Sequence, residues 1–184
     1  MGSVTREPSS PLINPSIVRY GATLPAAGPD GILGVSLIEI FVDADACPVK
    51  DEVYQVAGRY GLHVVLVANS RMNVPRGADV ELVVVDNGAD VADDWIADNI
   101  RAGDVAITAD IPLAARCLDV GAKVLGTNGR PFDRDMIGGA LAMRDLKTDL
   151  REVGTITGGP PPISAKDRSR FASRLDQLVQ QGLR

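Results

Sequence analysis

The chain has 184 residues, 45% of them hydrophobic, and a formal net charge of −5 with a single histidine. This length and apolar content are sufficient for one domain with a substantial core. The negative balance excludes a broadly basic surface, so any contact with nucleic acid must be local or assisted by metal ions. Two cysteines cannot build a disulfide scaffold, and no apolar stretch reaches the roughly 18 residues of a membrane span. We therefore expect a soluble, cytoplasmic protein that has no contact with a membrane.

The first 36 residues differ from the remainder of the chain. They are rich in proline, glycine, serine and alanine and show no sustained hydrophobic period. Such a composition is typical of a loosely packed segment. The segment also lacks the charged start and continuous apolar core of a secretory signal. We expect a flexible N-terminal arm over residues 1–36, followed by a single domain over residues 37–184.

From residue 38 onward, short runs rich in β-branched residues alternate with longer helical patterns. This alternation is typical of a parallel sheet with crossover helices. Several runs are apolar at consecutive positions, as expected for strands covered on both faces. The predicted fold class is therefore α/β, a three-layer α/β/α sandwich. The expected strands are IEIFVD (38–43), HVVLVA (63–68), ELVVVD (81–86), DVAIT (104–108) and KVLG (123–126).

Helices are predicted in the segments between these strands. Pro48 suits the first turn of a helix, so the first one should begin there. A second helix is expected over about 89–101, because an apolar arc repeats at helical spacing opposite an arc of aspartates. A third should begin after Asp110, and a fourth is predicted over about 133–150.

A final helix is predicted after a linker rich in proline and glycine, over about residues 164–182. Ser164 is a suitable N-cap, with Asp167 three residues further on. The apolar stripe of this helix is expected to pack on the domain or on a second copy of the chain, which makes a homodimer one expectation. The stripe comprises Phe171, Leu175, Leu178 and Val179.

Aspartates follow several of the predicted strands. The carboxyl ends of parallel strands and the starts of the next helices share one edge of the sheet, so these side chains should lie close together. Like charges at short range raise one another's pKa and destabilise the fold unless a cation neutralises them. Hard oxygen ligands of this kind suit Mg²⁺ or Mn²⁺. The candidate metal ligands are Asp43, Asp45, Asp90, Asp93, Asp94 and Asp110.

Four motifs, FVDADACPVK, VDNGADVADDWI, ITADIPLA and LGTNGRPFD, together resemble the YaiI/YqxD family of uncharacterised bacterial proteins, from about residue 38 to about 180. That family belongs to the wider PIN-like group, so the resemblance implies a parallel sheet in the order 3-2-1-4-5. PIN-type nucleases hold Mg²⁺ or Mn²⁺ with an Asp after the first strand, an acid on a central helix and an Asp after the fourth strand. Asp43, Asp94 (favoured over Asp90 and Asp93) and Asp110 match these catalytic positions.

The function implied is metal-assisted hydrolysis of phosphodiester bonds, with RNA favoured over DNA. The carboxylates would fix one or two ions that activate water and stabilise charge on the phosphate. His-based zinc sites and Ser-His-Asp catalysis are excluded, because the chain has no histidine besides His63, which lies at a strand start with no evident acidic partner. The candidate substrate contacts are Arg71, Asn128, Arg130 and Asp133.

Two alternatives remain open from the sequence alone. The pair Asp43 and Asp45 is similar to the strand-end motif of haloacid-dehalogenase-type phosphatases, although Asp104 precedes its strand where such enzymes place a second acidic motif after one. The other alternative is a non-catalytic metal-, nucleotide- or RNA-binding regulatory module. An aspartyl phosphate trapped on Asp43 would indicate the phosphatase, and RNA binding without cleavage would indicate the module.

Overall fold

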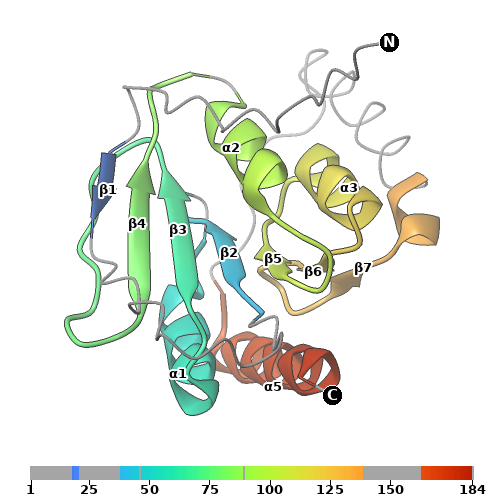
Figure 1. Cartoon of the computed structure of the whole chain (residues 1–184). Helices are drawn as coiled ribbons and strands as arrows, with labels where there is room; N and C mark the ends of the chain where they lie inside the picture. The colour runs from blue at the N-terminus through green and yellow to red at the C-terminus, as the bar shows by residue number, and fades with distance from the viewer. Residues whose placement is uncertain (1–17, 21–37, 46, 89, 139–162, 184) are drawn as a thin grey trace, which may run out of the picture.

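A mostly parallel β-sheet forms the centre of the protein in the computed structural model (Figure 1). The structure describes residues 18–20, 38–45, 47–88, 90–138 and 163–183. The strand order β4-β3-β2-β5-β6, in which all neighbours are parallel, confirms the predicted order 3-2-1-4-5. These parallel strands are β2 (Ile40–Asp43), β3 (Val64–Ala68), β4 (Val80–Val84), β5 (Val105–Ile107) and β6 (Lys123–Leu125).

Two antiparallel strands that the sequence did not predict border the parallel centre. Strand β1 (Val18–Tyr20) pairs with β4, and β7 (Pro131–Phe132) pairs with β6. The sheet in the described part of the chain thus has seven strands. Strand β1 lies within the segment predicted as an arm, and the rest of that segment is outside the described residues.

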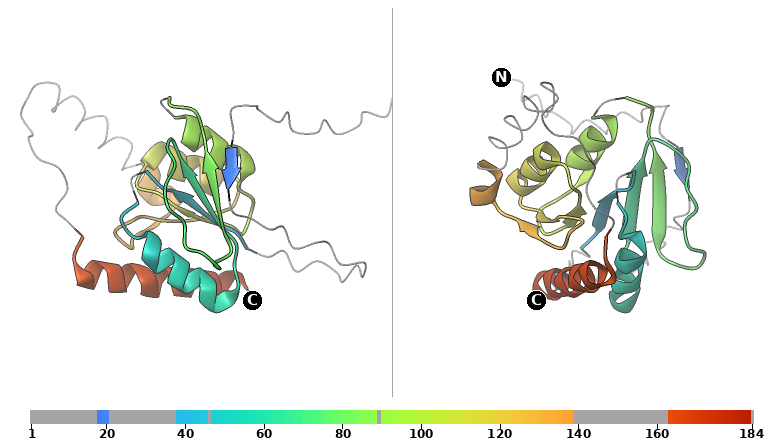
Figure 2. Two further views of the ribbon diagram at one scale, coloured as in Figure 1. Left: turned by 90° about the vertical axis from the view of Figure 1, so that its left-hand side faces the viewer. Right: turned by 180° about the vertical axis from the view of Figure 1, so that it is seen from behind.

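The helices form two layers, one on each face of the sheet (Figures 1 and 2). On one face lie α1 (Lys50–Tyr60) and α5 (Ala165–Gly182), and on the other lie α2 (Val91–Asn99) and α3 (Ile111–Asp119). The predicted three-layer α/β/α architecture is therefore confirmed. Of the helix predicted over 133–150, residues 134–138 are helical, and residues 139–150 lie outside the described part. None of the described helices combines the length and apolar character needed to cross a membrane.

Alternation along β2 assigns its side chains to the two layers. Ile40 and Val42 belong to the core cluster on the α1 and α5 side, and Phe41 belongs to the cluster on the α2 and α3 side. Successive side chains of a strand point to opposite faces. Asp43, the last residue of β2, therefore follows Phe41 onto the side of α2 and α3.

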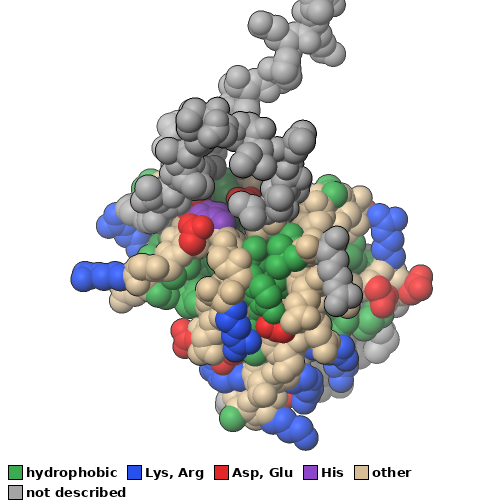
Figure 3. All heavy atoms as spheres, turned by 60° about the horizontal axis from the view of Figure 1, so that its bottom comes forward, with side chains coloured by type: hydrophobic (Ala, Val, Ile, Leu, Met, Phe, Trp, Pro, Cys, Tyr) green, Lys and Arg blue, Asp and Glu red, His purple; other side chains and the backbone are tan. Residues whose placement is uncertain are grey.

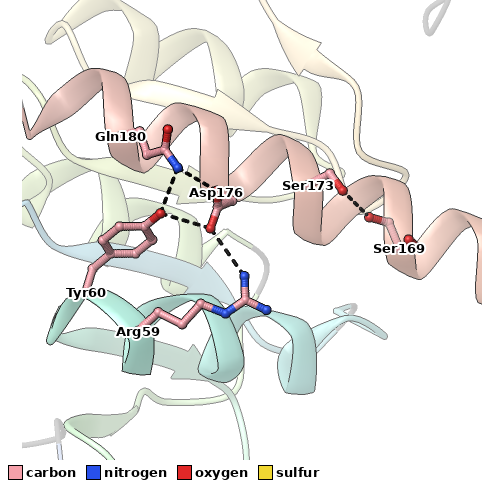
Figure 4. A network of polar contacts seen from close by, with 6 residues as sticks. All are labelled: Arg59, Tyr60, Ser169, Ser173, Asp176 and Gln180. Carbon is pink, nitrogen blue, oxygen red and sulfur yellow. Dashed lines mark hydrogen bonds and ion pairs between the residues drawn. The ribbon is translucent and has the colours of Figure 1, made fainter.

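Helix α5 packs on the domain through the predicted apolar stripe. Phe171, Leu175 and Val179 are fully buried, and burial of one such side chain contributes roughly 1.5–3 kcal/mol. Ser164 caps the helix as predicted, in a capping box with Asp167. The contact with α1 includes a polar network in which Asp176 accepts hydrogen bonds from Tyr60, Arg59 and Gln180 (Figure 4).

Candidate functional site

The site edge is the edge of the sheet formed by the carboxyl ends of β2, β3, β4, β5 and β6 and by the loops that follow them. At its centre, the Thr108 hydroxyl donates to Asp43 Oδ2 at 3.1 Å, and the backbone N–H of Asp110 donates to Thr108 Oγ1 at 2.9 Å. Thr108 is 1% exposed. One buried hydroxyl thus links the ends of two neighbouring strands. The sequence analysis missed Thr108, although it stands two residues before Asp110 in the ITAD motif.

Asp110 is fixed at the start of α3. Its backbone is extended, and its Oδ1 accepts the N–H of Leu113 at 3.0 Å, which is a standard N-cap interaction. This cap holds the carboxylate close enough to Asp43 for the two charges to interact. The sequence prediction that these two aspartates share one edge therefore agrees with their positions.

The start of α2 brings one aspartate toward this pair and turns the next one away. Asp93 interacts electrostatically with Asp110 and Asp43, and burial together with these like charges raises its pKa to about 6. Asp94 instead accepts a hydrogen bond from Arg116 Nη1 at 2.6 Å, with its side chain 63% exposed. Asp90 is exposed and has a left-handed backbone with φ of 62°. The sequence favoured Asp94, whereas the geometry places Asp93 beside Asp43 and Asp110.

The environment of Asp43 opposes its ionisation. Burial raises the pKa of this carboxyl, the hydrogen bond from Thr108 lowers it, and the charges of Asp45 and Asp110 raise it further. Lys50 provides a nearby positive charge, and its ammonium donates to the carbonyls of Ala44 and Cys47 at 2.8 and 2.9 Å. Lys50, the last residue of FVDADACPVK, was also missed, because a lysine in a first helical turn is an ordinary solvated residue.

Asp45 holds the neighbouring loops together at the same edge. Its Oδ2 accepts the backbone N–H of Asn69 at 2.7 Å, and the Asn69 amide donates to the carbonyl of Asp86 at 2.9 Å. The loops that follow β2, β3 and β4 are thereby joined. Asp45 itself is exposed.

The predicted substrate contacts occupy different places. Asn128 Oδ1 accepts the N–H of Arg130 at 2.9 Å within the loop after β6, and Arg130 and Arg71 are exposed. Asp133 Oδ1 accepts the N–H of Met136 at 2.7 Å. Because β7 runs antiparallel to β6, Asp133 returns to the start of β6. The structure therefore does not bring Asp133 to the site edge.

The carboxylates suit an open metal site better than a closed one. Among the residues that the structure describes, no group of three or more His, Cys, Asp or Glu side chains is arranged to hold a metal ion. Mg²⁺, however, is commonly bound by one or two carboxylates, several waters and a substrate phosphate. The oxygen donors of Asp43, Asp93 and Asp110 fit that kind of coordination.

Comparisons with known proteins agree with the motif analysis. The chain matches the family model described as "Uncharacterized BCR, YaiI/YqxD family" over residues 41–181. The UPF0178 protein amb2838 of Paramagnetospirillum magneticum is 53% identical over 148 residues, which cover 80% of this chain and 98% of the relative. A UPF0178 protein of Azorhizobium caulinodans is 55% identical over 142 residues, 77% of this chain and 89% of the relative. No solved structure matches the chain significantly.

The chain belongs to the YaiI/YqxD family, as its motifs predicted. The family description and the names of these relatives state no activity. The chemistry must therefore be argued from the site itself.

Proposed function

We propose that this protein is a metal-dependent nuclease that hydrolyses phosphodiester bonds, with RNA as the favoured substrate. The observation that carries the proposal is the convergence of Asp43, Asp93 and Asp110 at the site edge, where the charge of Asp110 opposes the ionisation of both Asp43 and Asp93. Carboxylates whose pKa values are raised by burial and by each other are concentrated at functional sites. The strand order and the places of these acids also agree with the PIN-like arrangement suggested by the motifs.

Each residue has a defined role in this proposal. Asp43 and Asp110 would hold Mg²⁺ or Mn²⁺, which would supply activation of water and neutralisation of charge on the phosphate. Thr108 orients Asp43 through its hydroxyl and restrains the backbone at Asp110. Asp93, which lies within electrostatic reach of Asp43 and Asp110, takes the proton from the attacking water as a general base.

A cleavage screen with active-site variants tests the proposal. Labelled single-stranded RNA, structured RNA and DNA flaps are incubated with the protein in Mn²⁺, in Mg²⁺ and in chelator. Asp43→Asn and Asp110→Asn each keep the side-chain shape but remove an anionic ligand, so metal-dependent cleavage should fall at least about 100-fold. Thermal melting should show that both variants remain folded.

Asp86→Asn is the matched control for this screen. Asp86 is an exposed acid at the same edge, and its hydrogen bond to Asn69 uses the backbone carbonyl, which the substitution leaves in place. It should cleave like the wild type. Equal cleavage by all three variants would assign the activity to a contaminating nuclease. RNA binding without cleavage under every condition would favour the non-catalytic module.

A further inference from the structure

The exposed face of α5 carries a line of positive charges. Lys166, Arg170 and Arg174 are exposed and follow one another at intervals of four residues, which places them on one side of the helix, about 6 Å apart along its axis. We refer to these three residues as the cationic stripe. Ser169 and Ser173 are exposed beside it, and the buried residues of α5 lie on the opposite side of the helix.

The acids of α5 do not cancel the charge of the stripe. Asp176 is engaged by Arg59 and Tyr60 of α1 (Figure 4). Asp167 belongs to the capping box and also pairs with Arg170 at 3.0 Å. That ion pair is partly exposed, and such pairs contribute about 0–1 kcal/mol, so a phosphate can replace the carboxylate. A space-filling view shows Lys and Arg side chains gathered in the lower part of the picture (Figure 3).

The first half of α5 lies at the site edge. Arg168 Nη1 donates to the carbonyl of Pro48 at 2.8 Å, and Pro48 lies in the loop between β2 and α1. A side chain at Gly129 would lie 3.1 Å from the backbone of Phe171, so the loop that carries Arg130 packs directly against α5. The helix ends at the opposite edge, where Lys123 donates to the carbonyl of Leu178. The cationic stripe therefore begins at the site edge, where the strands followed by the carboxylates end.

We propose that the cationic stripe binds the phosphate backbone of a single-stranded RNA whose chain continues across the site edge to Asp43 and Asp110. This inference rests on the proposed nuclease function and assigns it a substrate-binding surface. In a protein with a net charge of −5, binding of a polyanion needs a local basic surface of this kind. The one aromatic residue of α5, Phe171, is buried and cannot stack on bases. Recognition at the stripe is therefore of phosphates and independent of sequence.

The carboxylates and the stripe lie on opposite faces of the sheet, and both are near the site edge. A helix with its side chains is about 10–12 Å across, so a few nucleotides reach from the exposed side of α5 round the edge to the carboxylates. The loop containing Asn128 and Arg130 lies between the two surfaces, because it follows β6 and packs on α5. This position gives exposed Arg130 a phosphate contact between the stripe and the carboxylates.

Fluorescence anisotropy with a labelled single-stranded RNA, measured in chelator, tests the stripe apart from cleavage. The test protein carries Lys166→Gln, Arg170→Gln and Arg174→Gln, since glutamine preserves helix propensity. Each phosphate contact on a single strand contributes about 0.7 to the salt dependence, so the slope of log K against log salt should become shallower by about 2. Between about 50 and about 200 mM salt, the wild type should thus lose about 16-fold more affinity than the variant.

The matched control removes the same charge outside α5, with Arg76→Gln, Arg101→Gln and Arg134→Gln. All three side chains are exposed, and this protein should bind as tightly and with the same slope as the wild type. Single variants Lys166→Gln and Arg174→Gln, each with a slope change of about 0.7, keep the test decisive if the triple variant is unfolded.

Equal affinities and slopes for the stripe variant and the control would overturn the inference. A wild-type protein that binds anionic phosphatidylserine vesicles but no RNA would also overturn it and would assign the stripe to a lipid surface. The nuclease proposal is judged separately, because chelator prevents metal-dependent cleavage and the Asp43→Asn test uses a different measurement.

Discussion

The acidic side chains at the two edges of the parallel sheet have opposite electrostatic environments. At the amino edge, where the parallel strands begin, acids meet hydrogen-bond donors and a histidine. Asp104 is buried and accepts the backbone N–H groups of Glu39 and Arg101 at 3.0 and 2.8 Å. At the site edge, Asp43 and Asp110 each accept a hydrogen bond as well, but together with Asp93 they form a group of like charges within electrostatic reach. The first arrangement stabilises the fold, whereas the second costs stability.

His63 completes the amino edge and corrects one expectation. The sequence suggested that this histidine has no acidic partner, but Nδ1 lies 2.8 Å from Asp79 and Nε2 lies 3.5 Å from Glu81. The hydrogen bond with Glu81 raises the pKa of His63 most, and together with Asp79 it outweighs desolvation to give a value of about 9. Glu81 has the larger effect although it is farther away, because its side chain is 10% exposed and that of Asp79 is 51% exposed.

The contrast separates acids that stabilise the fold from acids that are placed for chemistry. The acids of the amino edge have hydrogen-bond donors or a positive charge as partners, and the same kind of pairing is possible at the site edge. Like charges that remain together at a strand-end crevice are therefore better explained by a ligand than by packing. Three substitutions test this difference between the two edges.

Asp104→Ala should have the largest effect. It would leave two backbone N–H groups at the amino edge without their acceptor, and each buried unsatisfied group costs about 1–3 kcal/mol. We expect a loss of about 3 kcal/mol in the free energy of unfolding, measured by urea denaturation. Asp104→Asn, which retains one acceptor oxygen, should lose less. A loss below about 0.5 kcal/mol for the alanine variant would contradict the role given to this edge.

His63→Gln should cost about 2 kcal/mol near pH 6 and little near pH 10. Because the folded pKa of about 9 lies above the unfolded value of 6.5, the stabilisation is fully present below 6.5 and is lost as the pH rises through 9. Urea unfolding of both proteins at the two pH values measures this difference. A stability difference independent of pH would show that protonated His63 is not what holds Asp79 and Glu81.

Asp93→Asn should have the smallest effect and the opposite sign. The folded pKa of about 6 lies above the reference of 3.8, so the stabilisation from protonation is complete below 3.8 and is lost as the pH rises through 6. At neutral pH the variant should therefore gain about 1 kcal/mol, a value discounted for solvent screening, and the gain should vanish near pH 4.

Asp94→Asn is the control for the adjacent position. It breaks only the exposed pair with Arg116 and should lose at most about 0.5 kcal/mol. Metal-dependent cleavage should fall in Asp93→Asn and remain near the wild-type level in Asp94→Asn. The reverse result would restore Asp94, the aspartate favoured by the sequence, to the site.

The features that could be predicted from the sequence are those that depend on a local pattern of residues or on the strand order. Consecutive apolar runs identified the five parallel strands, and the Ser164 cap identified the start of α5. The motifs then gave the strand order. Strand β1 was not predicted because it lies in a segment without a sustained hydrophobic period, and β7 was not predicted because it has only two residues. Strand β7 also begins with Pro131, which cannot donate to a ladder and is confined to positions such as an edge.

The missed side-chain partners depend on geometry that no short pattern contains. Which aspartate of α2 faces Asp43 depends on the rotation of the helix about its axis, with Ala92 and Ile96 buried against the sheet. The partners of His63 lie 16 and 18 residues away, and only the register of β3 with β4, which aligns Val64 with Val80, brings them to it.

The two cysteines give each layer of the protein its own chemical reporter. Cys47 lies in the core cluster under α1 and α5, and Cys117 lies in the cluster under α2 and α3. Burial raises their pKa values to about 11 and about 12, and only the thiolate reacts readily with alkylating reagents. Alkylation of either cysteine in the native state therefore requires local opening of the layer that buries it. The ratio of the two labelled peptides, followed by mass spectrometry in the unmodified protein, reports which layer opens first.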